Sequence, residues 1–155
     1  MKSIIDKEQS DWCADFDPAM KHHPESVSAL YDVVTNSKAY LLRVATQMDP
    51  FHSKQFVFLD GGYCHGDRSR FPPNFDWKPK LPPEKISTVT VSGGFLGGDR
   101  DAVFEFSARY QAVFEELLRR GYVDDDQTVL VDLINRHPRL FNLVFGDWFD
   151  AFRLF

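Results

Sequence analysis

The stretch QFVFLDGG, residues 55–62, decides the fold class of this chain. Its apolar run is β-branched or aromatic at most positions and ends in two glycines, which predicts a buried strand that leads into a sharp turn. Before this strand, apolar residues between positions 27 and 48 recur at helical spacing, with a gap near Asn36 and Ser37. This pattern predicts one or two helices that end before Pro50.

The segments after the strand add a loop, a second strand and a long helix. Residues 63–85 contain five prolines and form a connection of a length that is usually functional or mobile. The run TVTVS, residues 88–92, has the composition and alternation of a strand. A helix follows, which Asp99 or Asp101 can cap at its start and Gly121 can close at its end.

The last part of the chain predicts one more helix and one more strand. Asp124 and Gln127 resemble a capping box, and the apolar residues after them continue a helix to Pro138. Residues 140–145 then favour a final strand. This order of elements predicts an α/β fold in which a mixed sheet is flanked by helices.

The composition fits one domain that spans residues 1–155, of which residues 1–25 are polar and are expected to be irregular. The net charge of −5 argues against a partner that is a nucleic acid. No run approaches the about 18 apolar residues of a membrane span, and the N-terminus lacks a secretory apolar region, so we expect a cytoplasmic protein. Two cysteines are too few for a disulfide scaffold or a complete zinc site.

Asp60 is the first candidate for a functional residue, because it ends the apolar strand and precedes two glycines. Open α/β sheets bind ligands at the carboxyl ends of their strands, and a carboxylate there suits a hard cation and its phosphate oxygens. The alternative is an Asp that only caps the turn through its own backbone.

The glycines of GGFLGGD, residues 93–99, form the second candidate site. Paired glycines around Phe95 and Leu96, ahead of a helix, predict a turn whose N–H groups can face an anion or a sugar hydroxyl. The spacing is neither that of a dinucleotide fingerprint nor that of a Walker A loop. A purely structural turn is the alternative.

The acidic run Asp124, Asp125 and Asp126, followed by Gln127, is the third candidate. Adjacent carboxylates repel one another, and a helix N-terminus offsets only part of that repulsion. A metal ion or a network of sugar hydroxyls would supply the rest, whereas a solvated helix cap is the alternative. Trp77, in the proline-rich loop, could stack on a sugar ring or could anchor that loop to the core.

Five short motifs follow one another along the chain, at residues 31–38, 49–53, 56–62, 93–98 and 125–128. They are similar to the patterns Y-x-V-W-x-x-K, N-P-F-x-S, an aromatic strand that ends in Asp-Ala-Gly or Asp-Gly-Gly, G-G-F-F-G-G and D-D-Q-T. Through these motifs and its C-terminal stretch, the chain resembles the HtrL/YibB-type family of predicted glycosyltransferases. Its departures are Val34, where that family usually has Trp, and Asp49, where it has Asn.

The resemblance implies a partial GT-A-like nucleotide-diphospho-sugar transferase fold. It also implies a nucleotide-sugar donor, a glycan or other hydroxyl acceptor, and a divalent cation, Mn²⁺ or Mg²⁺. Members of the family are longer at the N-terminus, so this chain is expected to lack the family's N-terminal unit. A truncated, non-catalytic member that acts as a sugar-binding or protein-interaction module is the alternative function.

The resemblance also gives roles to the candidate residues. Asp60 would bind the cation together with the diphosphate of the donor. Asp125 or Asp126 would act as the base for the acceptor hydroxyl. The predicted substrate-binding residues are Gly93, Gly94, Phe95, Gln127 and Trp77.

Overall fold

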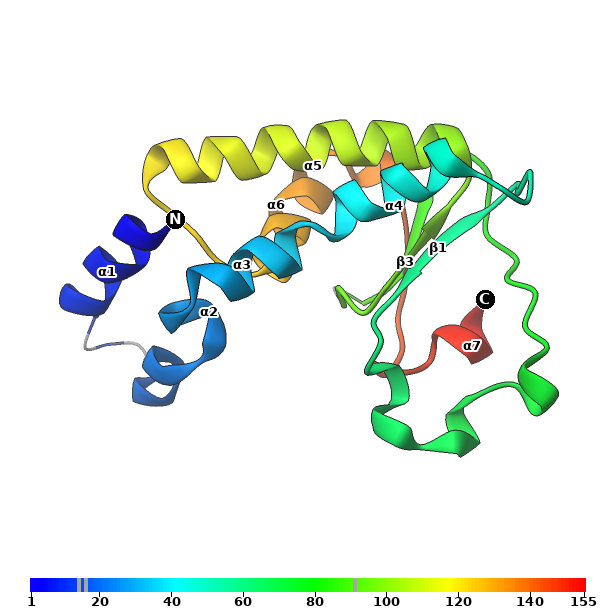
Figure 1. Cartoon of the computed structure of the whole chain (residues 1–155), viewed down its shortest axis with the longest axis horizontal. Coiled ribbons are helices and arrows are strands. Elements are labelled where there is room, and N and C mark those ends of the chain that lie inside the picture. The colour runs from blue at the N-terminus through cyan, green and yellow to red at the C-terminus, as the bar shows by residue number, and fades with distance from the viewer. Residues whose placement is uncertain (14, 16, 91) are drawn as a thin grey trace.

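Figure 1 shows the computed structural model of the chain, which describes residues 1–13, 15, 17–90 and 92–155. The α-helices of this part are α1 (Lys2–Ser10), α2 (Pro24–Val27), α3 (Ala29–Asn36), α4 (Lys38–Met48), α5 (Arg100–Arg120), α6 (Asp126–Arg136) and α7 (Ala151–Leu154). The strands are β1 (Phe56–Leu59), β2 (Ile86–Val89), β3 (Phe95–Gly98) and β4 (Phe141–Val144). Short 3-10 turns link several of these elements.

The four strands form one mixed sheet in the order β1-β3-β2-β4. Strand β3 is antiparallel to β1 on one side, where Phe58 lies opposite Leu96, and antiparallel to β2 on the other. Strands β2 and β4 are parallel, with Ile86 opposite Phe141. The structure therefore confirms the predicted α/β class and the predicted mixed sheet with flanking helices.

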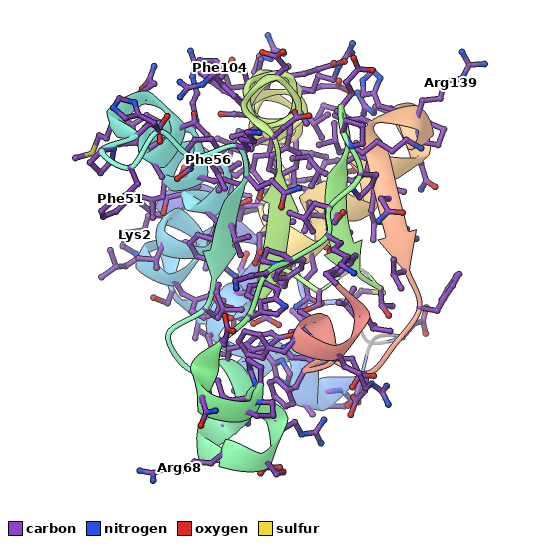
Figure 2. The ribbon with its side chains drawn as sticks, turned by 90° about the vertical axis from the view of Figure 1, so that its right-hand side faces the viewer. Lys2, Phe51, Phe56, Arg68, Phe104 and Arg139 are labelled. Atoms are coloured by element: carbon purple, nitrogen blue, oxygen red, sulfur yellow. The ribbon has the colours of Figure 1, made fainter. Side chains whose placement is uncertain are left out.

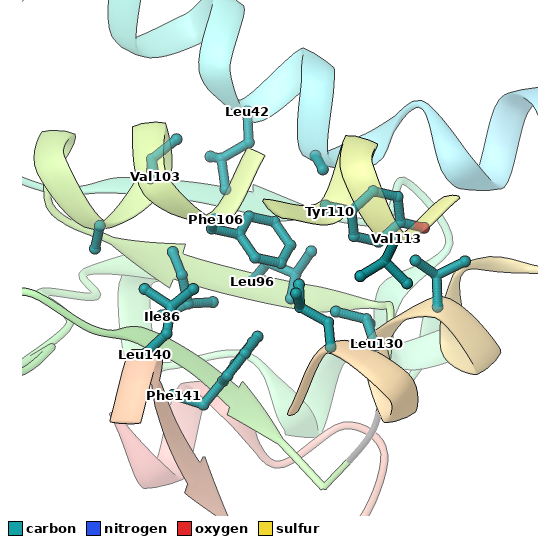
Figure 3. Packing of buried hydrophobic residues seen from close by; sticks show 14 of the residues in the cluster. Leu42, Ile86, Leu96, Val103, Phe106, Tyr110, Val113, Leu130, Leu140 and Phe141 are labelled. Atoms are coloured by element: carbon teal, nitrogen blue, oxygen red, sulfur yellow. The ribbon is translucent and has the colours of Figure 1, made fainter. Parts of the chain in front are cut away.

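One face of the sheet packs against helices α4, α5 and α6 and forms the main core. Figure 3 shows Phe106 of α5 over Leu96 of the sheet, with Val103 of α5 and Leu42 of α4 above them and Ile86 of the sheet below. All five of these side chains are almost completely buried. Burial of this much apolar surface in one cluster is the main stabilising contribution to such a domain.

The other face of the sheet is covered by α7 and the long connection between β1 and β2. Because side chains alternate along a strand, Val57 and Leu59 point to this face while Phe56 and Phe58 point to the helices. In Figure 2 the part of the connection that carries Arg68 extends below the sheet, next to α7. The connection contains three 3-10 turns, at Tyr63–Gly66, Arg68–Arg70 and Pro73–Phe75.

The helix boundaries mostly follow the predicted signals. The Asp99 carboxylate caps α5 by accepting from the Ala102 N–H at 2.9 Å, and Gly121 ends that helix with φ at 81°. The predicted gap near Asn36 and Ser37 separates α3 from α4. The cap of α6 lies one residue later than predicted, because Asp125 rather than Asp124 accepts from the Gln127 N–H.

The prediction of a glycine turn at residues 93–98 was wrong in its second half, because Phe95–Gly98 is the strand β3. Packing requires glycine at Gly98, where a Cβ would meet backbone, whereas at Gly97 it would meet the movable end of a side chain. A Cβ on Gly97 would lie 2.8 Å from Leu81 Cδ1, and one on Gly98 would lie 2.8 Å from the Lys85 carbonyl oxygen. The preceding strand also differs from the predicted 88–92: β2 covers Ile86–Val89, and Val91 lies outside the described residues.

The expectation that residues 1–25 are irregular was also wrong, since α1 covers Lys2–Ser10. Most residues of α1 are polar, but Lys, Glu and Gln have good intrinsic helix propensity, and Ile5 alone is buried on this helix. A helix that buries one side chain gives almost no periodic apolar signal. Among the described residues, no helix is long and apolar enough to cross a lipid bilayer.

Candidate functional site

The ammonium group of Lys38 lies at the meeting point of three distant segments of the chain. Its Nζ is 3.0 Å from Oδ2 of Asp126, 3.4 Å from Oδ2 of Asp60 and 3.2 Å from the carbonyl oxygen of Gly93. We call these four residues the Lys38 cluster. Asp60, Gly93 and Asp126 were predicted as site residues from the sequence. Lys38, the cation of the cluster, was not.

The strand pairing places Asp60 next to the glycines. Strands β1 and β3 are antiparallel, with the last residue of β1, Leu59, opposite the first residue of β3, Phe95. Asp60 therefore lies opposite Gly94, and its backbone N–H donates a 3.0 Å hydrogen bond to the Gly94 carbonyl. This bond fixes the direction in which the chain leaves β1, and it brings the Asp60 carboxylate to the rim of the sheet beside Lys38.

Gly93 lies against the carboxylate of Asp126. A Cβ built on Gly93 would overlap the Asp126 carboxylate, so any side chain at this position would displace that carboxylate. Gly94 is less crowded, since its Cβ would lie 3.3 Å from Oγ of Ser92 and 3.4 Å from Nε1 of Trp148. The first glycine of the motif therefore lets the N-terminus of α6 approach the backbone that precedes β3.

The two carboxylates of the Lys38 cluster have different surroundings. The side chain of Asp126 is 4% exposed and that of Asp60 is 39% exposed, while that of Lys38 is 13% exposed. Burial raises the pKa of the Asp126 carboxyl, and the Lys38 ammonium opposes that rise. One ammonium between two carboxylates leaves the cluster with one net negative charge. The Asp60 carboxylate, the more exposed of the two, presents this charge to solvent.

Asp125 and Gln127 lie beside the cluster and are bonded to each other. Oδ1 of Asp125 accepts from the Gln127 backbone N–H at 2.9 Å, and Oδ2 accepts from its side-chain amide at 3.2 Å. Burial raises the pKa of the Asp125 carboxyl, against the lowering effect of the Gln127 N–H. The predicted carboxylates thus divide between two positions: Asp126 faces Lys38, and Asp125 caps α6.

Phe95 and Trp77 lie in the aromatic cluster on the other face of the sheet. The Phe95 ring is completely buried and stacks on Phe155 at a centroid distance of 5.0 Å. Trp77 contacts Phe95 at 5.9 Å and Phe152 at 4.9 Å, both edge to face. The structure does not bring these two side chains into the Lys38 cluster, and the packing of Trp77 is the one expected of a loop anchor. Their role in substrate binding stays a prediction.

Two side chains that position the site, those of Asn36 and Tyr110, were not predicted from the sequence. Asn36 donates to the carbonyl oxygens of Asp124, at 2.8 Å, and Asp32, at 2.9 Å. The Tyr110 hydroxyl donates to Oδ1 of Asn36 at 2.7 Å. Asn36 and Lys38 lie in the first family-like motif, but their partners Asp124 and Asp126 lie far away in the sequence, so no local pattern indicated these contacts.

The Lys38 cluster offers a divalent cation one accessible carboxylate, that of Asp60. Within the described residues, no group of three or more His, Cys, Asp or Glu is placed to hold a metal ion. A site of this composition fits an ion such as Mg²⁺ that takes its remaining ligands from water and from phosphates of a bound substrate. It does not fit a cation held by the protein alone.

Comparison with known proteins identifies the family of the chain. The chain belongs to the HtrL_YibB family, described as "Bacterial protein of unknown function", whose profile matches residues 1–92 and 87–155. It is also 28% identical, over 188 aligned positions, to "Protein HtrL" of Escherichia coli (strain K12). That alignment covers all of this chain and 64% of the relative, so the chain spans less than two thirds of the relative's length. No solved structure matches the chain.

Proposed function

We propose that this chain is a glycosyltransferase domain that binds a nucleotide-sugar donor and depends on a divalent cation, Mn²⁺ or Mg²⁺. The observation that supports the proposal is the convergence on Lys38. Asp60 at the end of β1, Gly93 ahead of β3 and Asp126 at the start of α6 are far apart in sequence and meet within 3.4 Å of one ammonium group. Chemically distinct groups that meet at a strand end form the kind of place where α/β domains bind ligands.

The net charge of the Lys38 cluster supports the dependence on a cation. A diphosphate group is strongly anionic, and the cluster keeps one negative charge in spite of Lys38. Asp60, with 39% of its side chain exposed, would hold the cation together with the diphosphate oxygens. When bound there, the cation supplies positive charge that stabilises the departing nucleoside diphosphate.

The residues of the chain itself then have separate tasks. Lys38 keeps the buried Asp126 carboxylate paired and adds positive charge beside the diphosphate. The backbone at Gly93 and Gly94 would lie along the donor, where the absence of side chains permits a close approach. Asp125, which is more exposed than Asp126, would accept the proton of the acceptor hydroxyl of a glycan or other alcohol.

Calorimetric titration with nucleoside diphosphates tests this proposal. We expect the parent chain to bind one of them in the presence of Mn²⁺ and to lose that binding in EDTA. Asp60→Asn should weaken the binding by at least about tenfold, because the accessible carboxylate of the cluster is then neutral. Asp101→Asn is the matched control, since Asp101 is an exposed carboxylate on α5.

Three results decide the outcome. Binding that is unchanged by EDTA and by Asp60→Asn would remove Asp60 and the cation from the proposal. The absence of binding by any common nucleoside diphosphate or nucleotide-sugar would contradict the donor. Cation-dependent binding without release of nucleoside diphosphate from any nucleotide-sugar would favour the alternative, a family member that binds sugars but does not catalyse transfer.

A further inference from the structure

A cavity of about 740 Å³ lies between the N-terminal helices and the region where α5 ends and α6 begins. Apolar side chains from several elements line it, among them Ile4, Leu117, Val123 and Val129. Its volume falls within the range of about 300–1,000 Å³ that is typical of small-molecule sites. It is separate from the Lys38 cluster, none of whose four residues lines it.

Carboxylates from three different parts of the chain reach the wall of this cavity. Glu8 comes from α1, Glu25 from α2 and Asp124 from the segment before α6. Asp11 and Asp17 also line the cavity but are exposed, and Lys7 is the one Lys or Arg among the described lining residues. Behind this wall lies Asp32 of α3, whose side chain is completely buried. Among the residues that the structure describes, neither carboxylate oxygen of Asp32 has a hydrogen-bond partner. We call Glu8, Glu25, Asp32 and Asp124 the Asp32 cluster.

The Asp32 cluster lacks a positive charge of its own. Within the described part of the chain, no Lys or Arg forms an ion pair with any of its four members, and Glu25 pairs only with His23. Burial raises the pKa of Asp32 to about 6, and the charges of Asp124, Glu25, Asp125 and Glu8 add to that rise. Burial, with the Asp124 charge, also raises the pKa of Glu8. A buried charge without a partner, such as that of the Asp32 carboxylate, is costly, and a cation bound nearby would offset the cost.

We infer that the cavity binds a small organic cation, an ammonium group carried on an apolar body. The apolar lining fits the body, and the carboxylates of the Asp32 cluster fit an ammonium group, which donates up to three hydrogen bonds. A bare metal ion fits less well, because the described carboxylates are not grouped closely enough to ligate one. The inference is independent of the proposed glycosyl transfer.

Two probes of equal shape test the inference, phenethylammonium and its neutral counterpart 2-phenylethanol. Calorimetric titration of the full chain near neutral pH and at low salt should show that the ammonium compound binds at least about tenfold more tightly than the alcohol. In the double variant Glu8→Gln/Glu25→Gln, the preference should fall below about threefold, because two of the wall charges are removed. Glu115→Gln is the control, since Glu115 is exposed on α5 away from the cavity.

Each result supports or overturns the inference. A preference for the ammonium compound that is lost in the double variant and kept in Glu115→Gln supports a cation site in this cavity. Equal binding of the two probes by the parent chain, or binding of neither, overturns it. A preference that is unchanged in the double variant also overturns it, because half of the Asp32 cluster has then lost its charge without effect.

Discussion

Two groups of carboxylates, the Lys38 cluster and the Asp32 cluster, each contain one buried Asp, and among the described residues only the Lys38 cluster has a lysine or arginine. In the Lys38 cluster an ammonium group stands between Asp126 and Asp60. In the Asp32 cluster the central carboxylate is more deeply buried, yet neither of its oxygens has a partner among the described residues. Within this cluster, Asn36 donates to the backbone carbonyls of both Asp32 and Asp124.

The difference between the groups shows in their titration behaviour. Burial raises the pKa of both Asp126 and Asp32, but Lys38 opposes the rise for Asp126, whereas every charge acting on Asp32 adds to it. Removing one partner of a buried ion pair lowers the stability of the fold, and so does burying a charge that has no partner. Removing the cation of the Lys38 cluster should therefore lower stability, whereas removing the charge of Asp32 should raise it.

The largest effect is expected from Lys38→Met, which removes the cation of the Lys38 cluster. The substitution leaves the Asp126 carboxylate buried without its cation and should cost about 3–5 kcal/mol of unfolding free energy near neutral pH. The loss should be smaller at low pH, where Asp126 is protonated. Urea denaturation measures it, with Lys54→Met, at an exposed lysine, as the control.

Adding Asp126→Asn to Lys38→Met should recover part of the loss, because the unpaired charge is then removed. This double variant also allows the test to proceed where Lys38→Met alone does not fold. Equal stability of the single and double variants would show that Lys38 and Asp126 are not coupled.

A smaller effect on the free energy of unfolding, of opposite sign, is expected from Asp32→Asn in the Asp32 cluster. The pKa of Asp32 is about 6 in the folded chain against an ordinary value of 3.8, so the folded state binds this proton more tightly than the unfolded state. The parent should therefore lose stability as the pH rises through about 6. Asp32→Asn should be more stable than the parent by roughly 1–3 kcal/mol above that range, with little difference at about pH 4.

Urea denaturation at the two pH values measures this difference, with Asp101→Asn as the control at an exposed carboxylate. An advantage of Asp32→Asn that is the same at both pH values would arise from something other than the charge. A loss of stability at the higher pH would mean that Asp32 has a cationic partner.

The smallest effect is expected from Tyr110→Phe, which weakens the contact that Asn36 makes between Asp32 and Asp124. The Tyr110 hydroxyl donates to Oδ1 of Asn36 at 2.7 Å, and its removal should cost about 1 kcal/mol. Hydrogen exchange should become faster at the start of α6, which Asn36 holds through the Asp124 carbonyl. The control is Tyr122→Phe, at an exposed tyrosine; equal effects of the two variants would show that Asn36 does not need the Tyr110 donor.

Reasoning from the sequence found the elements that have local signals. The apolar run of β1, the Asp99 cap and the Gly121 end of α5 were predicted, because caps, turns and periodicity depend on neighbouring residues. It failed at α1, which buries only Ile5, and at β3, whose glycines resemble a turn. In both places the deciding contacts lie outside the segment itself.

The candidate site divides in the same way. Asp60, Gly93 and Asp126 were identified as candidates from the sequence, and the structure brings them together. Phe95 and Trp77 were identified by the same reasoning and lie in the aromatic core instead. An aromatic side chain next to a functional glycine has the same local pattern whether it faces a ligand or the other side of a sheet.

The sequence by itself determined the α/β class, the strand that ends in Asp60 and the family to which the chain belongs. Only the tertiary structure decided that Lys38 is the cation between Asp60 and Asp126, that Gly93 lies against the Asp126 carboxylate, and that Asp32 is buried without a partner in the described part of the chain. The physical reason is that capping and periodicity act over a few residues, whereas pairing and burial of charge depend on contacts between residues far apart in the chain.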